Sequence, residues 1–161
     1  MPMDKAVTIE LEHRRKDGSI FPAEVRMSVL IYNGKKTVLG FARDISERKK
    51  NEEKILQLSL AVEQSPASIV ITNPEGAIEY VNKKFTEVTG YTVEEALGMN
   101  PRILKSGKMP DRLYKDLWET ITAGKEWHGE MINRRKDQSL YWELVSISPV
   151  KNPKGEITHF I

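Results

Sequence analysis

The chain of 161 residues carries 25 lysines and arginines against 23 aspartates and glutamates, and it contains no cysteine. Without cysteine, disulfides, thiolate nucleophiles, zinc–thiolate clusters and cysteine-linked cofactors are excluded. Charges of both signs are interspersed along the chain, which argues against a nucleic-acid partner. No apolar stretch reaches the roughly 20 residues that span a bilayer. We therefore expect a cytoplasmic polypeptide, although a longer parent protein could still be membrane-anchored.

An internal repeat is the most informative feature of the sequence. The string HRRKDGSIFPAEV at 13–25 returns as NRRKDQSLYWELV at 133–145, with a period of 120 residues. Solenoid repeats are shorter, at about 20–50 residues, so this period indicates a duplicated domain. We predict that residues 1–43 are the C-terminal strands of a truncated first copy and that residues 66–161 are a second, nearly complete copy.

The first copy reads as three antiparallel strands at 7–13, 20–31 and 37–41. Turn residues separate the strands at Lys16-Asp17-Gly18 and Asn33-Gly34. So small a sheet is marginal by itself, because its apolar face needs a cover. A second chain, the linker helix or strand exchange could supply that cover. We therefore predict a homodimer, either side by side or domain-swapped.

Residues 44–65 read as a helical linker. The segment contains no glycine or proline and is rich in strong helix formers, with Asp44 or Ser46 as the cap and Pro66 as the stop. Its apolar end consists of Ile55, Leu56, Leu58, Leu60 and Val62. Two interpretations are open: an amphipathic helix that lies on its own domain, or a parallel two-stranded coiled coil.

The second copy alternates strands and helices in the order β-β-α-α-α-β-β-β. Strands are predicted at 68–72, 77–81, 127–134, 140–150 and 157–161. The three helices between them are expected to start at caps formed by Asn82, Thr92 and Asp111, and Glu95 completes a capping box with Thr92. This order predicts an α+β domain with the helices grouped on one face of an antiparallel sheet.

Two stretches, GYTVEEALGMNPRIL and LYKDLWETITAGKEWHGEMINRRKDQSLYWELVSISPVKNPKGEITHFI, closely resemble PAS domains. The string GFARDISERKK at 40–50 resembles the junction between a PAS domain and its output helix. The resemblance implies the PAS fold, a five-stranded antiparallel sheet with helices on one face. It also implies a non-catalytic sensory and dimerisation module of a larger signal-transduction protein, such as a two-component sensor histidine kinase or a cyclic-dinucleotide enzyme. In such proteins a change of ligand or redox state is relayed through the linker helix.

Within the family, the sequence is most similar to flavin redox-sensing and light-oxygen-voltage (LOV) domains. Pro101 stands where LOV domains carry their reactive cysteine, so a flavin–cysteinyl adduct is excluded. The resemblance implies the following candidate cofactor-binding residues: Asn100, Arg102, Trp118, Trp127, Asn133 and Glu143. Glu143 replaces the second asparagine of LOV domains. The alternative is that the polar members serve turns and surface pairs and that the tryptophans belong to the core.

The cofactor is accordingly expected to be either absent or a flavin, with FAD favoured over FMN. Haem is not expected, because haem-binding PAS domains place a histidine on the long helix and residues 113–122 contain none. A small carboxylate ligand met by Arg102 or Arg112 and a ligand-free structural coupling domain stay open. No glycine-rich ATP loop, Gly-Gly-Asp-Glu-Phe string or Gly-x-Ser-x-Gly elbow is present, so we expect no enzymatic activity.

Overall fold

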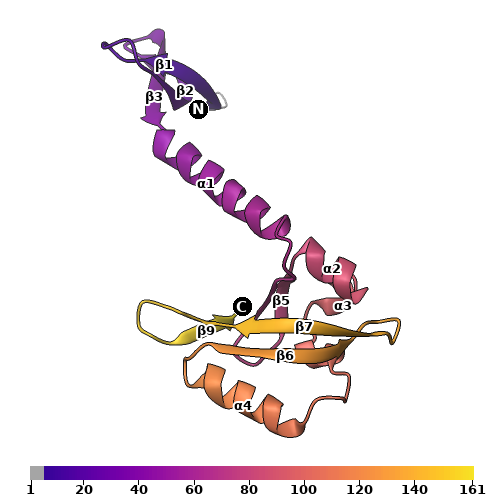
Figure 1. The fold of residues 1–161 in the computed structure, drawn as a ribbon. Coiled ribbons are helices and arrows are strands. Elements are labelled where there is room, and N and C mark those ends of the chain that lie inside the picture. The colour runs from indigo at the N-terminus through magenta and orange to yellow at the C-terminus, as the bar shows by residue number, and fades with distance from the viewer. Residues whose placement is uncertain (1–5) are drawn as a thin grey trace. The chain divides into compact units, whose positions relative to one another are not determined.

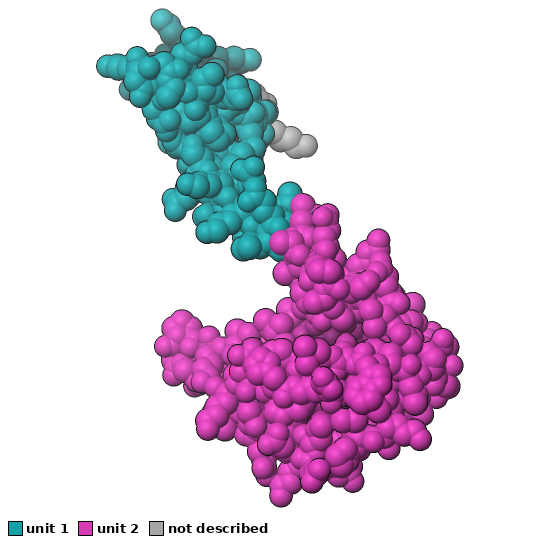
Figure 2. Space-filling view, in the orientation of Figure 1, with its two compact units in different colours: residues 1–58 teal, residues 59–161 magenta. Residues whose placement is uncertain are grey.

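The computed structural model describes residues 6–161, and the chain divides into two compact units, residues 1–58 and 59–161 (Figure 2). The predicted first domain begins at residue 1, and its first five residues lie outside the described part. Among residues 6–161, no helix combines the length and the apolar character that crossing a bilayer requires.

The first unit contains a three-stranded antiparallel meander (Figure 1). Its strands are β1 (Val7–Arg14), β2 (Ile20–Tyr32) and β3 (Lys35–Asp44). The turn between β2 and β3 is built by Asn33 and Gly34, whose φ angles of 49° and 73° are both positive, as the tight two-residue hairpin turn requires. The three strands predicted from the sequence are therefore confirmed.

Most apolar side chains of the sheet in the first unit are exposed to solvent. Only Ala23 and Ile45 are buried among residues 6–58. The exposed large apolar residues of the sheet are Val7, Leu11, Ile20, Val29, Ile31, Tyr32, Val38, Leu39 and Phe41. Because burial of apolar surface is the main stabilising contribution, this sheet gains little stability from side-chain packing within its own unit.

Helix α1 (Ser46–Glu63) follows β3 directly, as the composition of the linker predicts. The Asp44 carboxylate accepts a hydrogen bond of 2.9 Å from the Ser46 backbone N–H at the start of the helix. No residue of α1 is buried. The exposed apolar side chains near its end are Ile55, Leu56, Leu58 and Leu60.

The second unit has the α+β architecture that the sequence predicts. Its elements are β4 (Val70–Thr72), β5 (Ile78–Val81), α2 (Lys83–Thr89), α3 (Val93–Ala96), η1 (Pro101–Leu104), α4 (Asp111–Thr122), β6 (Trp127–Arg134), β7 (Leu140–Ile147), β8 (Pro149–Lys151) and β9 (Ile157–Phe160). Strands β7 and β8 are one strand interrupted at Ser148, which exchanges two backbone hydrogen bonds with Ile161. The order is thus β5-β4-β9-β8/β7-β6, a five-stranded antiparallel sheet.

Helix α4 covers the inner face of this sheet (Figure 1). Leu117 and Ile121 of the helix pack with Trp127, Met131 and Phe160 of the sheet. A second buried cluster lies under the shorter helices and consists of Ile78, Val81, Phe85, Ala96 and Leu104. The apolar stripe of α4 at helical spacing therefore belongs to the core.

Two of the three predicted helix caps are confirmed and one is wrong. Asn82 accepts from the Phe85 N–H, and Thr92 forms a complete capping box with its partner three residues later. Asp111, by contrast, is the first residue of α4 rather than its cap. The cap is Pro110, whose extended backbone (φ −68°, ψ 145°) fits that position and which has no side-chain donor or acceptor. At the first helical position the Asp111 carboxylate instead interacts favourably with the positive end of the helix dipole.

Candidate ligand site and signalling junctions

A small polar cluster lies on the inner face of the sheet, and we call Asn133, Tyr141 and Glu143 the inner-face cluster. Asn133 of β6 is paired with Tyr141 of β7, and Glu143 is the next residue of β7 on the same face. The Asn133 carboxamide Nδ2 donates a hydrogen bond of 2.7 Å to Glu143 Oε2. Asn133 is buried. Strand alternation thus brings these groups to the face that α4 covers.

The ionisable groups of the inner-face cluster are partly removed from water. Burial raises the pKa of Glu143 above its ordinary value, and the hydrogen bond from Asn133 offsets part of that rise. Burial, assisted by the nearby charge of Glu143, raises the pKa of Tyr141 to about 12. At neutral pH the tyrosine is therefore a neutral hydroxyl, and ionisation of Glu143 is disfavoured by desolvation.

Two tyrosine hydroxyls of this region are buried without a hydrogen-bond partner among residues 6–161. They belong to Tyr141 of the inner-face cluster and Tyr114 of α4. The Tyr141 hydroxyl is close enough to Glu143 and Asn133 for hydrogen bonding with each to influence its pKa, but neither contact reaches the geometry of a full hydrogen bond. Buried hydroxyls normally find a partner, so the site has unused capacity to bind a polar group.

Three other predicted site residues gather at a different place, the turn at Gly76. Asn100 caps η1, and its Oδ1 accepts hydrogen bonds of 3.1 Å from the backbone N–H and from Nε of Arg102. A Cβ atom on Gly76 would lie 2.6 Å from Asn100 Nδ2 and 3.1 Å from the Trp118 ring. Trp118 also meets Phe160 edge to face. The Arg102 side chain is exposed, so this group forms a structural turn.

Trp127, the last predicted site residue, belongs to the core. Its indole Nε1 donates a hydrogen bond of 2.8 Å to Asp116 Oδ2 on α4. Its ring lies across Gly129, where a Cβ atom would be only 2.3 Å from the ring. For Trp127 the core interpretation is therefore the one that the contacts support.

The structure thus brings together two of the six predicted residues, Asn133 and Glu143, on the inner face. Sequence reasoning missed Tyr141 and Tyr114. The signal for Tyr141 was available, because residues 141 and 143 share one face of a strand. No sequence signal marked Tyr114, whose hydroxyl is buried only by the packing of α4. Among the described residues, no group of three or more metal-ligating side chains gathers.

A surface hollow of about 450 Å³ lies between the end of α2 and the β6–β7 turn. It is lined by Glu87, Thr89, Gly90, Arg135, Lys136 and Asp137. Its basic groups already have partners. Arg135 Nε donates a hydrogen bond of 2.7 Å to the Val88 carbonyl, and Lys136 forms an ion pair of 2.5 Å with Glu95. The residues that line the hollow therefore connect the β6–β7 hairpin to α2.

The start of α1 is fastened to the sheet of the first unit by charged side chains. Arg48 pairs with Glu10 at 2.5 Å and with Glu24 at 3.2 Å, and these two glutamates are cross-strand neighbours. Asp44 is also the ion-pair partner of Arg15 in the first hairpin turn. Each pair is partly exposed and individually weak. Together they connect β1, β2 and the turn to the first turn of the helix.

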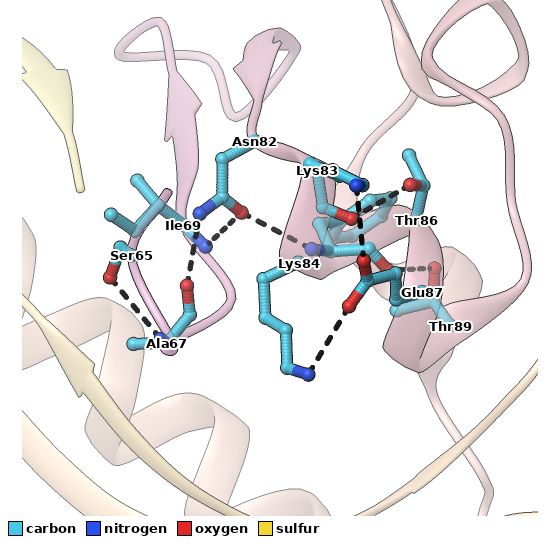
Figure 3. Close-up of polar contacts among 10 residues, drawn as sticks. Ser65, Ala67, Ile69, Asn82, Lys83, Lys84, Thr86, Glu87 and Thr89 are labelled. Atoms are coloured by element: carbon cyan, nitrogen blue, oxygen red, sulfur yellow. Dashed lines mark hydrogen bonds and ion pairs between the residues drawn. The ribbon is translucent and has the colours of Figure 1, made fainter. Parts of the chain in front are cut away.

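Asn82, which is completely buried, joins the end of α1 to the start of the second repeat copy, and Figure 3 shows its bonds to Ala67 and Ile69. Its Nδ2 donates hydrogen bonds of 3.1 Å to the Val62 carbonyl of α1 and of 3.0 Å to the Ala67 carbonyl. Its Oδ1 accepts from the Ile69 and Phe85 N–H groups at 2.9 and 3.1 Å. One side chain therefore joins the helix end, the start of β4 and the first turn of α2.

The family model described as "PAS domain" matches residues 1–47 and 66–161. The chain belongs to the PAS-domain family. Both segments of the internal repeat are covered by the match, so both repeat copies contain PAS sequence. The PAS chain is a sensory module of the kind found in signal-transduction proteins.

Similarity to curated proteins extends over much of this PAS chain. It is 38% identical over 100 residues to a "Nitrogen fixation regulatory protein" of Klebsiella oxytoca, which covers 62% of the chain and 20% of that protein. It is 32% identical over 157 residues to the "Oxygen sensor protein DosP" of Escherichia coli, 94% of the chain and 19% of that protein. A "Blue-light-activated histidine kinase" of Brucella anthropi is 31% identical over 63% of the chain and 21% of its own length. The chain thus spans about a fifth of the curated relatives it matches.

Solved structures agree on the fold. The Aureochrome1 LOV domain in its light state superposes with a TM-score of 0.56 at 27% identity, covering 66% of this chain and 82% of that one. An RNA-binding light-oxygen-voltage receptor superposes with a TM-score of 0.61 over 97% of this chain and 74% of that one, at 15% identity. The predicted PAS fold is confirmed.

Proposed function

We propose that the second PAS copy senses a small molecule held at the inner-face cluster, and that its response is relayed through α1. The observation that carries the proposal is the partly buried Asn133–Glu143 hydrogen bond next to the Tyr141 hydroxyl, which is buried without a well-formed hydrogen bond. A buried polar group without a partner costs free energy, which a bound polar molecule would recover. The ligand is therefore expected to present hydrogen-bonding atoms to this face.

A flavin fits this set of donors and acceptors. The Glu143 carboxylate can accept from a ring N–H, and the Asn133 carboxamide can donate to a ring carbonyl. When bound, a flavin would supply redox-dependent protonation of its ring. We favour FAD over FMN, as the resemblance implies. A free carboxylate ligand fits less well, because it would lie beside the half-buried carboxyl group of Glu143 and because the exposed Arg102 is bonded to Asn100.

The test is the absorbance spectrum of the purified protein, followed by mass spectrometry of whatever denaturation releases. Flavin absorption that is lost in Asn133→Ala and Glu143→Ala, but kept in a control with the exposed helix residue Asn51→Ala, is the expected result. A featureless spectrum would reject flavin. A featureless spectrum together with no released small molecule would reject the ligand proposal as a whole.

A second candidate function is a ligand-free coupling domain. It is favoured by the core itself, because α4 and the sheet pack directly against each other through Leu117, Ile121, Trp127, Met131 and Phe160. The same mass-spectrometry experiment separates the two candidates. For a coupling domain, substitutions at the inner-face cluster would change stability and no binding property.

We also propose that the module works as a homodimer, with α1 as a coiled-coil linker. Support comes from the exposed Ile55, Leu56, Leu58 and Leu60 and from the open apolar sheet of the first unit. Light scattering should give a dimer that Leu56→Lys with Leu60→Lys weakens, while Gln57→Lys leaves it intact. A monomer at high micromolar concentration would exclude the dimer, side by side or domain-swapped.

The order of segments along the chain supports the relay of a signal between PAS copies. The segments are the strands of one PAS copy at 1–43, a linker at 44–65 and a second PAS copy at 66–161. We propose that the chain is a non-catalytic part of a larger cytoplasmic signalling protein with a histidine kinase or cyclic-dinucleotide output. The named relatives, which include a histidine kinase and an oxygen sensor, support such a setting. Expression of the parent protein with and without residues 1–161 would show whether the output depends on them.

A further inference from the structure

The turn between β2 and β3 consists of Asn33 and Gly34, and both residues are exposed. The Asn33 carboxamide carbon is an electrophile, and the backbone nitrogen of the next residue is the nucleophile that can attack it. In the described part of the chain, the Gly34 N–H has no backbone acceptor, and an added Cβ on Gly34 would meet nothing within 4 Å. The side-chain hydrogen bond nearest to the turn joins Thr37 Oγ1 to the Lys35 carbonyl. Both reacting groups are therefore open to water and held by no described neighbour.

The other asparagines of the chain each lack one of these conditions. Asn51 lies inside α1, where the following N–H is bonded along the helix. The N–H that follows Asn82 donates a hydrogen bond of 3.0 Å to Glu63 Oε2. Asn133 is buried and bonded to Glu143. The remaining three precede proline, whose nitrogen carries no hydrogen: Asn73, Asn100 and Asn152. Asn33 is thus set apart by its surroundings as well as by the glycine that follows it.

The Asp17-Gly18 pair in the first hairpin turn shows what protection looks like. Asp17 Oδ1 accepts hydrogen bonds of 2.9 Å from the Ser19 N–H and of 2.7 Å from Ser19 Oγ. These bonds hold the pKa of Asp17 below its ordinary value, so at neutral pH the group is a carboxylate and a poor electrophile. The Gly18 N–H donates 3.0 Å to the Arg15 carbonyl. Here both reacting groups are bonded, whereas at Asn33 neither is.

Ring closure at Asn33 needs rotation of its backbone out of the left-handed conformation (φ 49°), so the turn must open first. The outer half of the hairpin offers little resistance to opening. Its large apolar side chains have exposed fractions between 40% and 65%: Val29, Ile31, Tyr32 and Val38. Segments with few buried contacts open at a low free-energy cost, and a non-glycine residue that leaves the left-handed region is relieved of strain. The turn therefore opens more readily than the packed parts of the chain.

We propose that Asn33 is a site of spontaneous covalent modification, at which asparagine is converted to isoaspartate. The Gly34 nitrogen forms a bond to Asn33 Cγ, the Cγ–Nδ2 bond breaks, and the amide proton leaves with that nitrogen as ammonia. Water then opens the cyclic imide. Addition of water at Cγ gives aspartate, and addition at the main-chain carbonyl carbon gives isoaspartate. Water is the only co-reactant.

Isoaspartate changes the backbone of the turn, whereas aspartate changes only its charge. The main chain of isoaspartate runs through the Cβ atom, so the two-residue turn gains one backbone atom. The positive φ angles of the turn match the twist of the flanking strands, and the longer link does not reproduce them. The pairs next to the turn, Tyr32–Lys35 and Leu30–Thr37, should then separate. The new carboxylate by itself is compatible with the hairpin, because Asp-Gly is also a favoured sequence for this turn.

The test incubates the full chain at neutral pH and follows its tryptic peptides by mass spectrometry. Cleavage after Arg26 and Lys35 isolates the peptide 27–35, in which Asn33 is the only carboxamide residue. This peptide should gain the mass of an amide-to-acid conversion about tenfold or more faster than the peptides with the other asparagines. A protein-isoaspartyl methyltransferase with labelled S-adenosylmethionine should then label it. Asn33→Gly is the matched control, because Gly-Gly supports the turn and has no carboxamide.

The effect on the hairpin is measured by amide hydrogen exchange of Leu30 and Thr37, followed by NMR. Exchange should accelerate by about tenfold in the isoaspartyl protein and stay unchanged in freshly prepared Asn33→Asp. Peptide 27–35 without the mass gain, or with a gain but no methyl label, would overturn the modification site. Equal rates at all asparagines would also overturn it, because they would indicate unfolding of the whole chain. Unchanged exchange after conversion would overturn the effect on the hairpin.

Discussion

Gly18 and Gln138 occupy the same left-handed position in two copies of one hairpin turn, with φ angles of 88° and 74°. The two turns have equivalent hydrogen bonds. The Arg15 N–H donates a hydrogen bond of 2.8 Å to the Ser19 carbonyl, and the Arg135 N–H donates one of 2.9 Å to the Ser139 carbonyl. The turn geometry therefore requires a positive φ at this position in both copies. Only the first copy uses glycine, the residue that adopts it without strain.

Replacing Gln138 by glycine should stabilise the second unit. We expect Gln138→Gly to raise the free energy of unfolding by about 0.5–1 kcal/mol, because relief of left-handed strain exceeds the entropy cost of glycine. All three tryptophans lie at 118, 127 and 142, so tryptophan fluorescence in urea reports on this unit alone. The reverse change in the first copy, Gly18→Gln, is the control and should leave the fluorescence transition unmoved. A loss of stability in Gln138→Gly would contradict the strain argument.

Asn82→Ala should be among the most damaging single substitutions in the second unit. It removes four hydrogen bonds, takes the side-chain donor from the Ala67 carbonyl and leaves the Val62 carbonyl with only the Ser65 N–H at 3.3 Å. We expect a loss of about 3 kcal/mol or more in urea unfolding. Thr92→Ala, which removes only an exposed helix cap, should cost about 1 kcal/mol. Similar losses for the two variants would show that Asn82 acts only as a cap.

Gly129→Ala should disrupt the core although Gly129 has an ordinary strand conformation. The added methyl group would sit 2.3 Å from the Trp127 ring, which the hydrogen bond to Asp116 holds in place. We expect a loss of about 2–3 kcal/mol and a red shift of tryptophan emission as the indole is displaced. The strand residue Gly40 is the control, since its nearest contact to an added Cβ is 3.8 Å. An unshifted emission maximum would refute the packing argument.

Glu143 should make the stability of the second unit fall as pH rises. Because its pKa is higher in the folded than in the unfolded state, the unfolded chain loses the proton first. Stability is then highest below the ordinary glutamate pKa and decreases until the raised folded pKa is passed. In the described part of the chain, Asn133 and Tyr141 are the polar groups whose hydrogen bonding acts on the carboxylate, and both lower its pKa against the larger effect of burial.

The measurement is urea unfolding by tryptophan fluorescence from about pH 4 to about pH 8. Glu143→Gln should flatten the profile over this range, whereas Glu130→Gln, at an exposed site on the neighbouring strand, should not. At alkaline pH a second decrease should appear as Tyr141 titrates, because burial raises its pKa to about 12. A profile for Glu143→Gln that matches the unsubstituted protein would rule out Glu143 as the source.

Local patterns predicted the elements well where one short segment contains the whole signal. The capping box at Thr92 is such a case, because both of its hydrogen bonds lie within four residues. The prediction failed at Asp111, because Pro110 takes the cap position and Asp111 is the first residue of α4. It also grouped six residues into one site, of which the fold joins only Asn133 and Glu143 on the inner face.

The sequence alone determined the PAS fold, the duplication and the helical linker, because these follow from periodicity, turn residues and self-similarity along the chain. Tertiary structure decided which groups come together: the inner-face cluster and the four bonds of Asn82. Those features depend on strand register and on helix packing across segments far apart in sequence. Burial by such long-range packing, rather than residue type, determines the raised pKa of Glu143 and the unpartnered state of the Tyr141 hydroxyl.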